Sequence, residues 1–211
     1  MEEIQAIIYL KQTDPILGKL IERIGTNSLV LSYYHEELDL LTALSQAIIF
    51  QQISTTVAAK IFQRFLLLYQ QSDSELTAKA ILETPEDLLR SVGLSRPKIS
   101  YLKDLAEKIE QGLPTLAELA LMEDEAVIQT LTQVKGIGKW TAQMFLIFNL
   151  HRPDVLPVND LGIRSAIVKL YNLNSLPDPK TIEKLAQKWQ PYRSLACRYL
   201  WRSLAISDRV S

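Results

Sequence analysis

The chain has 211 residues, 47% of them hydrophobic, and a formal net charge of −1 at pH 7. Such a chain can bury a core in one domain or in two small ones, and no apolar run is long enough to predict a transmembrane span. The acidic start, Met1 to Glu3, does not match a secretory signal. A single cysteine, Cys197, excludes an internal disulfide and a four-cysteine iron–sulfur or zinc site, and suits a reducing cytosol.

Helical periodicity dominates the chain and no segment alternates as a strand would, so the predicted fold class is all-α. Asp14-Pro15 begins a helix that Gly25 ends, Ser54 caps another, and Thr84-Pro85 caps a third. The remaining expected helices span residues 40–50, 97–109, 122–131, 139–149, 160–171, 181–189 and 192–206.

Two breaks interrupt this series, at residues 26–37 and at the proline-containing segment 152–159. We therefore expect two helical lobes that flank a cleft. One is a middle lobe, 41–151, and the other combines 1–40 with 152–211.

The small net charge hides an uneven distribution. From Lys135 onward there are twelve Lys and Arg against five Asp and Glu, a net +7, while the first 134 residues carry −8. A local basic surface attracts phosphate whatever the total charge, although basic residues also scatter over solvated helix faces by chance.

Residues 131–142 read LTQVKGIGKWTA and predict a hairpin between two helices. Gly136 and Gly138 permit positive φ angles and leave no side chain between backbone and ligand. The N–H groups at the next helix start then form an anion site, to which Lys135 and Lys139 add charge. A plain helix–helix turn also needs glycine, but the flanking lysines favour DNA binding. The candidate DNA-binding residues here are Lys135, Gly136, Gly138, Lys139 and Thr141.

Asp160 lies twenty residues beyond Trp140, after the sequence LPVN and at the start of a predicted helix. Most aspartates at such a position are N-caps. A solitary carboxylate behind a DNA anchor also suits chemistry on a nucleotide. Spacing alone supports both roles equally.

Further short motifs accompany the hairpin and Asp160. Residues 51–54 read QQIS, and residues 189–193 read WQPYR, followed by Trp201. Together they resemble the helix-hairpin-helix glycosylases that carry a Gly/Pro-rich loop and a catalytic aspartate, and most closely the DNA-3-methyladenine glycosylase II family. The resemblance implies an all-α, two-lobed fold without the N-terminal β-domain of longer members. It makes Asp160 the catalytic residue, although Asn159 stands where relatives commonly have Asp.

The resemblance implies base excision repair by hydrolysis of a base–sugar bond. That reaction develops positive charge on the sugar, which a carboxylate at Asp160 would stabilise while it directs water. Relatives that act as lyases have lysine at the position of Trp140, and an indole cannot form a Schiff base. Lys139 would point elsewhere, since adjacent helix positions diverge by about 100°. We therefore expect a single-function glycosylase for alkylated purines such as 3-methyladenine and 7-methylguanine.

The flipped base needs an aromatic pocket. The candidates are Trp140, Tyr192, Met144 and Tyr34, of which Met144 serves core packing equally well. Gln52 matches the position that plugs the DNA stack in relatives, although it also suits a turn, and Ser54 beside it is a candidate DNA contact.

No cofactor is required and no iron–sulfur cluster is expected. The family's hairpin can hold a monovalent cation through backbone carbonyls, here those of Thr132, Val134 and Ile137. His35 and His151 lack partners at metal-site spacing.

The expected partner is double-stranded DNA with alkylated bases, bound by a monomer in the cytoplasm beside the chromosome; a nuclear location stays open. Two alternatives remain: a glycosylase for another damaged base, and a helix-hairpin-helix module that binds damage without cutting.

Overall fold

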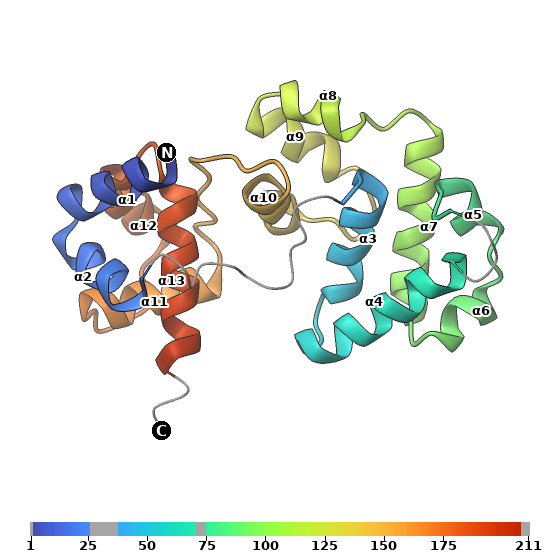
Figure 1. The fold of residues 1–211 in the computed structure, drawn as a ribbon, viewed down its shortest axis with the longest axis horizontal. Coiled ribbons are helices and arrows are strands. Elements are labelled where there is room, and N and C mark those ends of the chain that lie inside the picture. The colour runs from blue at the N-terminus through green and yellow to red at the C-terminus, as the bar shows by residue number, and fades with distance from the viewer. Residues whose placement is uncertain (1, 26–37, 71–74, 208–211) are drawn as a thin grey trace. The chain divides into compact units, whose positions relative to one another are not determined.

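The computed structural model describes residues 2–25, 38–70 and 75–207. Within these ranges every regular element is helical, with thirteen α-helices, one short 3₁₀ helix and no strand (Figure 1). The predicted all-α fold class is therefore confirmed. None of the helices in the described ranges has the length and apolar character needed to cross a membrane.

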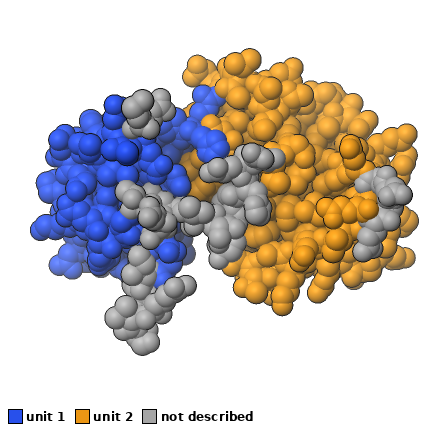
Figure 2. Space-filling view, in the orientation of Figure 1, with its two compact units in different colours: residues 1–32, 151–211 blue, residues 33–150 orange. Residues whose placement is uncertain are grey.

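The chain divides into two compact units (Figure 2). Unit 1 combines residues 1–32 with 151–211, and unit 2 is residues 33–150. The helices of unit 1 are α1 (Glu2–Thr13), α2 (Pro15–Ile24), α11 (Leu161–Tyr171), α12 (Pro179–Ala186), η1 (Gln187–Trp189) and α13 (Arg193–Ser207). Those of unit 2 are α3 (Leu40–Phe50), α4 (Thr55–Gln70), α5 (Ala78–Glu83), α6 (Glu86–Ser91), α7 (Arg96–Glu110), α8 (Leu116–Leu121), α9 (Asp124–Leu131) and α10 (Lys139–Phe148).

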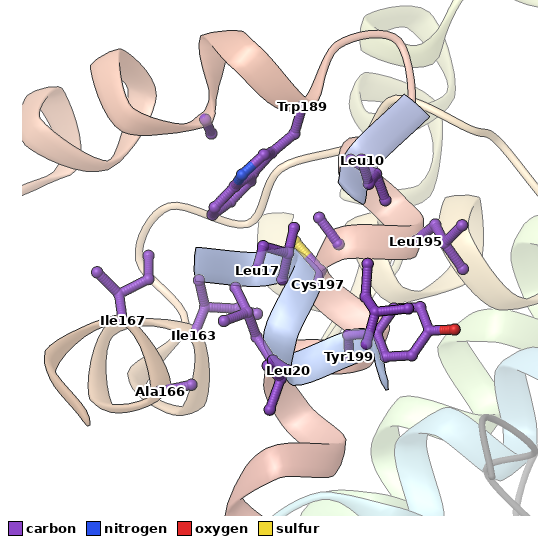
Figure 3. Close-up of a cluster of buried hydrophobic side chains, with 14 of the residues drawn as sticks. Leu10, Leu17, Leu20, Ile163, Ala166, Ile167, Trp189, Leu195, Cys197 and Tyr199 are labelled. Carbon is purple, nitrogen blue, oxygen red and sulfur yellow. The ribbon is translucent and has the colours of Figure 1, made fainter. Parts of the chain in front are cut away.

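Unit 1 is organised around α13, which packs against α2 and α11, while α1 packs against α2 and η1. Apolar side chains from these helices meet in one cluster, in which Leu10, Leu17, Ile163, Trp189 and Cys197 are fully buried (Figure 3). Each such leucine contributes roughly 1.5–3 kcal/mol through burial. This core fixes the start of α11 against α13.

A charged side chain also lies inside unit 1. Asp14 has no exposed surface, and its Oδ1 accepts hydrogen bonds from two backbone N–H groups of the first turn of α2. Its Oδ2 accepts from Trp189 Nε1 at 2.8 Å, from Lys188 Nζ at 3.0 Å and from the Tyr171 hydroxyl. Burial alone would raise the pKa of Asp14, but the hydrogen bonds outweigh burial and hold that pKa below its usual value.

Unit 2 is organised around α7, which packs against α3, α5 and α6. Helices α9 and α10 pack against each other, and α10 also contacts α3. The hairpin motif therefore belongs to unit 2, whereas Asp160 belongs to unit 1.

The expected cap at Thr84 was wrong. Helix α6 begins at Glu86 with Pro85 at its N-cap and no side-chain cap. Thr84 instead follows the end of α5, where its hydroxyl donates to the Ala80 carbonyl at 2.7 Å and lies 3.2 Å from the Tyr69 hydroxyl. A back-bond to the preceding turn is a common use of threonine at a helix end.

Candidate functional site

The hairpin spans residues 132–138, between α9 and α10. Val134 and Ile137 are 1% and 4% exposed, and the Ile137 N–H donates to the Val134 carbonyl at 3.0 Å. These two apolar residues fix the turn to unit 2. The polar residues on either side of them, together with both glycines, remain exposed.

Gly136 has φ +84°, as expected for a glycine in this turn. A Cβ at this position would lie 2.3 Å from Cδ2 of Tyr101 on α7. The missing side chain therefore leaves room for the Tyr101 ring. This differs from the expectation that Gly136 clears space for a ligand.

Gly138 has φ −92° and ψ 173°, so the expected positive φ was wrong at this position. Gly138 is the N-cap of α10 and makes no side-chain cap hydrogen bond. A Cβ there would meet no protein atom within 4 Å. The first N–H groups of a helix point outward past its N-cap, so Gly138 is the glycine that leaves their approach open.

The two glycines predict opposite phenotypes. Gly136→Ala should cost about 2–4 kcal/mol of stability, because alanine meets both a positive φ and the Tyr101 ring. Gly138→Ala should cost at most about 1 kcal/mol, while DNA affinity falls about tenfold because a methyl group obstructs the helix start. Urea unfolding and fluorescence anisotropy with a duplex would measure the two effects. Equal DNA affinity in Gly138→Ala and the wild type would exclude a phosphate at α10.

Side chains of α7 and of the residue that ends α3 form hydrogen bonds with the hairpin. The Lys135 N–H donates to Asp104 Oδ2 at 2.7 Å, and Lys135 Nζ lies 3.1 Å from Ser100 Oγ. The Gly136 carbonyl accepts from Gln51 Nε2 at 2.9 Å. Lys135 therefore contacts α7 as well as being exposed. Sequence reasoning missed Gln51 and Asp104, which lie 85 and 31 residues from their partners.

The turn between α3 and α4 presents Gln52, which is exposed and has φ +58°. Its left-handed backbone suits a tight turn. Its side chain is accessible to DNA, and the role of Gln52 as the plug in the DNA stack stays a prediction. Ser54 is exposed, and its carbonyl accepts from Ala58 N–H at 2.9 Å at the start of α4. Lys98 Nζ donates to the Ile49 carbonyl at 2.6 Å near the end of α3, and burial lowers the pKa of this lysine.

The candidate pocket residues lie in different environments. Trp140 is 48% exposed in the first turn of α10 and follows the exposed Lys139, whereas Thr141 and Met144 are 7% and 5% exposed. Tyr192 belongs to unit 1, where its ring packs edge-on against Tyr9 at a centroid distance of 5.4 Å. Tyr34, the fourth candidate, lies outside the described residues.

Asp160 is 8% exposed and is the N-cap of α11. Its Oδ1 accepts from the Ile163 N–H at 2.7 Å and from Trp201 Nε1 at 2.9 Å. Asp160 is therefore an N-cap in this structure. The same two hydrogen bonds hold its carboxylate in one orientation, as a catalytic role would require.

The segment before Asp160 is fastened to the start of α13. The Arg193 guanidinium binds the Asp154 carboxylate through two hydrogen bonds, of 2.7 and 2.9 Å. The Ser194 hydroxyl accepts from Val155 N–H at 2.9 Å, and Ser194 N–H donates to the Pro153 carbonyl at 3.0 Å. These contacts give the proline-containing segment a defined path towards α11.

Cys197 lies on the same face of α13, one turn after Arg193. It is fully buried, and burial, followed by the negative charge of Asp160, raises the pKa of its thiol. The thiol therefore stays protonated, and Cys197 belongs to the apolar core of unit 1. Among the described side chains, no group of three or more His, Cys, Asp or Glu residues is placed to hold a metal ion.

Comparison with known proteins places these features in a family. Residues 45–191 match the model of the HhH-GPD superfamily base excision DNA repair protein. The chain is 33% identical to DNA-3-methyladenine glycosylase 1 of Schizosaccharomyces pombe over 209 residues, covering 97% of this chain and 89% of that protein.

Two solved structures are also similar. The 3-methyladenine DNA glycosylase Mag1 of S. pombe, in complex with abasic DNA, aligns with a TM-score of 0.86 and 32% identity, over 98% of this chain and all of that one. A DNA-3-methyladenine glycosidase of Bacillus halodurans aligns with a TM-score of 0.80 and 30% identity, over 100% of this chain and 92% of that one. The chain belongs to the HhH-GPD superfamily of base excision DNA repair proteins.

Proposed function

We propose that the protein is a DNA glycosylase that flips alkylated purines out of duplex DNA and hydrolyses the bond between base and sugar. The observation that carries the proposal is a nearly buried aspartate, Asp160, held by two N–H donors in a chain of this superfamily. The similar proteins named above, which carry 3-methyladenine glycosylase names, support the choice of substrate.

The proposed chemistry needs little beyond a placed carboxylate. As the bond from C1′ to the base nitrogen lengthens, positive charge develops on the sugar. Asp160 stabilises that charge and directs a water molecule to C1′, and the electron pair of the broken bond leaves with the base. A purine nucleotide alkylated at N3 or N7, as in 3-methyladenine and 7-methylguanine, carries a positive charge on the base, which is therefore a good leaving group, so a general acid is not required.

Recognition of a cationic base favours electron-rich rings. Trp140 and Tyr192 are the proposed stacking partners, since Trp140 is exposed and Tyr192 is half-buried. Duplex DNA is proposed to contact the start of α10 and the exposed Gln52, with the protein acting as a chromosome-associated monomer.

The hairpin is also proposed to hold a monovalent cation through the carbonyls of Thr132, Val134 and Ile137. The Val134 carbonyl already accepts one hydrogen bond, from Ile137, and a carbonyl oxygen has a second lone pair with which to bind a cation. Nothing in the proposed hydrolysis uses an iron–sulfur cluster.

We expect no lyase activity, and Trp140→Lys should not create any. A nucleophilic lysine needs desolvation to lower its pKa from about 10.4, whereas this position is 48% exposed. Incubation of the variant with substrate and borohydride should therefore trap no covalent protein–DNA adduct. A trapped adduct would contradict this, and an established glycosylase-lyase serves as the positive control.

The function is tested by incubating the purified protein with methylated duplex DNA and measuring released 3-methyladenine and 7-methylguanine. Parallel duplexes with deaminated or oxidised purines test the alternative substrates. Release of only those bases would replace the alkylpurine assignment. Tight binding to damaged duplex without release of any base would instead favour a damage-binding module.

A further inference from the structure

We propose that Trp201 is a positioning residue that orients the Asp160 carboxylate, and that Gly162 provides the space for this contact. The inference rests on the proposed function, because Trp201 would orient the carboxylate that the proposed hydrolysis uses. Asp160, Gly162 and Trp201 all belong to unit 1.

The first argument is the number and direction of donors on one oxygen. An N-cap needs a single backbone donor, which Ile163 N–H supplies at 2.7 Å. The Trp201 indole adds a second donor to the same Oδ1, at 2.9 Å and from a different helix 41 residues away. A single hydrogen bond tolerates a range of angles, so with one donor the carboxylate can still rock about its Cβ–Cγ bond. A second donor to the same oxygen from a different direction narrows that range.

The second argument is the identity of the residue at position 162. Glycine in a helix is less favourable than alanine by roughly 0.5–1 kcal/mol, and Gly162 has no positive φ that would require it. A Cβ here would lie 3.0 Å from Asp160 Oδ1, 3.0 Å from Trp201 Cδ1 and 3.2 Å from Trp201 Nε1. A side chain at position 162 would therefore press on both Asp160 and Trp201.

The third argument is the way in which Trp201 itself is held. Trp201 is half-buried on α13, one turn after Cys197 and two turns after Arg193. Arg193 binds Asp154, at the start of the segment that leads to Asp160. The same face of α13 therefore contacts both ends of residues 154–160. Arg193 binds Asp154 at the first end, and the Trp201 indole binds Asp160 at the other.

The expected consequence is a loss of rate without a loss of DNA binding. A reacting group displaced by about 1 Å can lose on the order of 10²-fold in rate, whereas DNA affinity comes mainly from phosphate contacts. Trp201→Phe removes the N–H donor and keeps an aromatic ring. Gly162→Ala keeps the donor and crowds the pair.

The experiment measures three quantities for each variant. These are the single-turnover rate of 7-methylguanine release at saturating protein, the Kd for a duplex with an abasic-site analogue, and the urea unfolding midpoint. We expect the rate to fall about tenfold in Trp201→Phe and at least as much in Gly162→Ala, with Kd within about twofold of the wild type. Gly162→Ala should lose rate without a matching loss of stability, because helix propensity favours alanine.

Trp189→Phe is the matched control. It also removes an indole N–H that donates to a buried aspartate, here Asp14 at 2.8 Å. This variant should lower the unfolding midpoint and leave the single-turnover rate of the folded protein unchanged.

Wild-type rates in both Trp201→Phe and Gly162→Ala would overturn the positioning role and leave the proposed function standing. A rate that falls only in proportion to DNA affinity would also overturn it. A wild-type protein that releases no base would overturn the proposed function itself, and this inference with it.

Discussion

Asp160→Asn is expected to abolish base release while the protein remains folded and binds DNA. Asparagine caps helices about as well as aspartate, and its side-chain oxygen can accept from the donors that Asp160 Oδ1 meets, Ile163 N–H and Trp201 Nε1. The substitution therefore removes the negative charge and little else. Loss of a group that stabilises transition-state charge costs on the order of 10²–10³ in rate, and we expect at least that loss.

Single-turnover release of 7-methylguanine measures the effect, with Kd for an abasic-site duplex and urea unfolding as companion measurements. Asn159→Asp is the matched control, since position 159 is adjacent but exposed and should leave the rate unchanged. The double variant with both changes should stay inactive, because a carboxylate at position 159 lacks the contacts that hold Asp160. Comparable activity in Asp160→Asn and the wild type would remove Asp160 from the mechanism.

Asp14→Asn is expected to lower the free energy of unfolding by about 2–3 kcal/mol, the range of a lost buried hydrogen bond to a charged group, because the ammonium of Lys188 that remains is 38% exposed and keeps part of its hydration. Asp14 is fully buried and accepts from Trp189, Lys188 and Tyr171. In the variant an amide NH₂ group competes for this position, so that donors face donors. Urea unfolding at pH 7 measures the loss, and base release by the folded variant should be unaffected.

The effect of Asp14 should depend on pH in one direction. The pKa of Asp14 is held below that of an unfolded aspartate, about 3.9. Its contribution to stability is therefore fully present above pH 5 and is lost as the pH falls through the folded-state pKa. The stability gap between wild type and Asp14→Asn should be constant from pH 5 to 7 and should narrow below about pH 4. A gap that widened in acid would contradict the assignment.

Asp178→Asn is the control for local capping. Asp178 precedes a proline, caps α12 through Thr181 N–H at 2.8 Å and is exposed. Its replacement should leave the urea midpoint unchanged within error at pH 7. The contrast would assign the large effect at Asp14 to burial and not to the cap.

Asp14 and Asp178 also show how far the fold could be predicted from the sequence. Asp14-Pro15 and Asp178-Pro179 both begin a helix. The start at Pro15 was predicted, whereas the second helix was expected to begin at residue 181 and begins at Pro179. Only tertiary packing decides that Asp14 lies inside a core and Asp178 in solvent. The helices at 2–13, 78–83 and 116–121 were not predicted. The last two have six residues each, too few to show a clear periodicity.

In the candidate site, too, the local features could be predicted from the sequence and the long-range contacts could not. Local sequence located the hairpin and the helix start at Asp160, because glycines and caps act over a few residues. It assigned the same role to Gly136 and Gly138, although only Gly136 needs a positive φ and packs on Tyr101. The contacts of Gln51, Asp104 and Trp201 join residues 31 to 85 positions apart, and no local pattern reports such pairs.

The order of the two units along the chain has a consequence for biosynthesis. Unit 2 is continuous, whereas unit 1 is assembled from segments on either side of it. Domains tend to fold as they leave the ribosome, so the hairpin unit has its whole sequence available first. Asp160 is synthesised next, but Arg193 and Trp201, which fasten its segment and its carboxylate, follow only with α13. A nascent chain therefore completes the unit that contains the hairpin before it acquires an ordered carboxylate at Asp160.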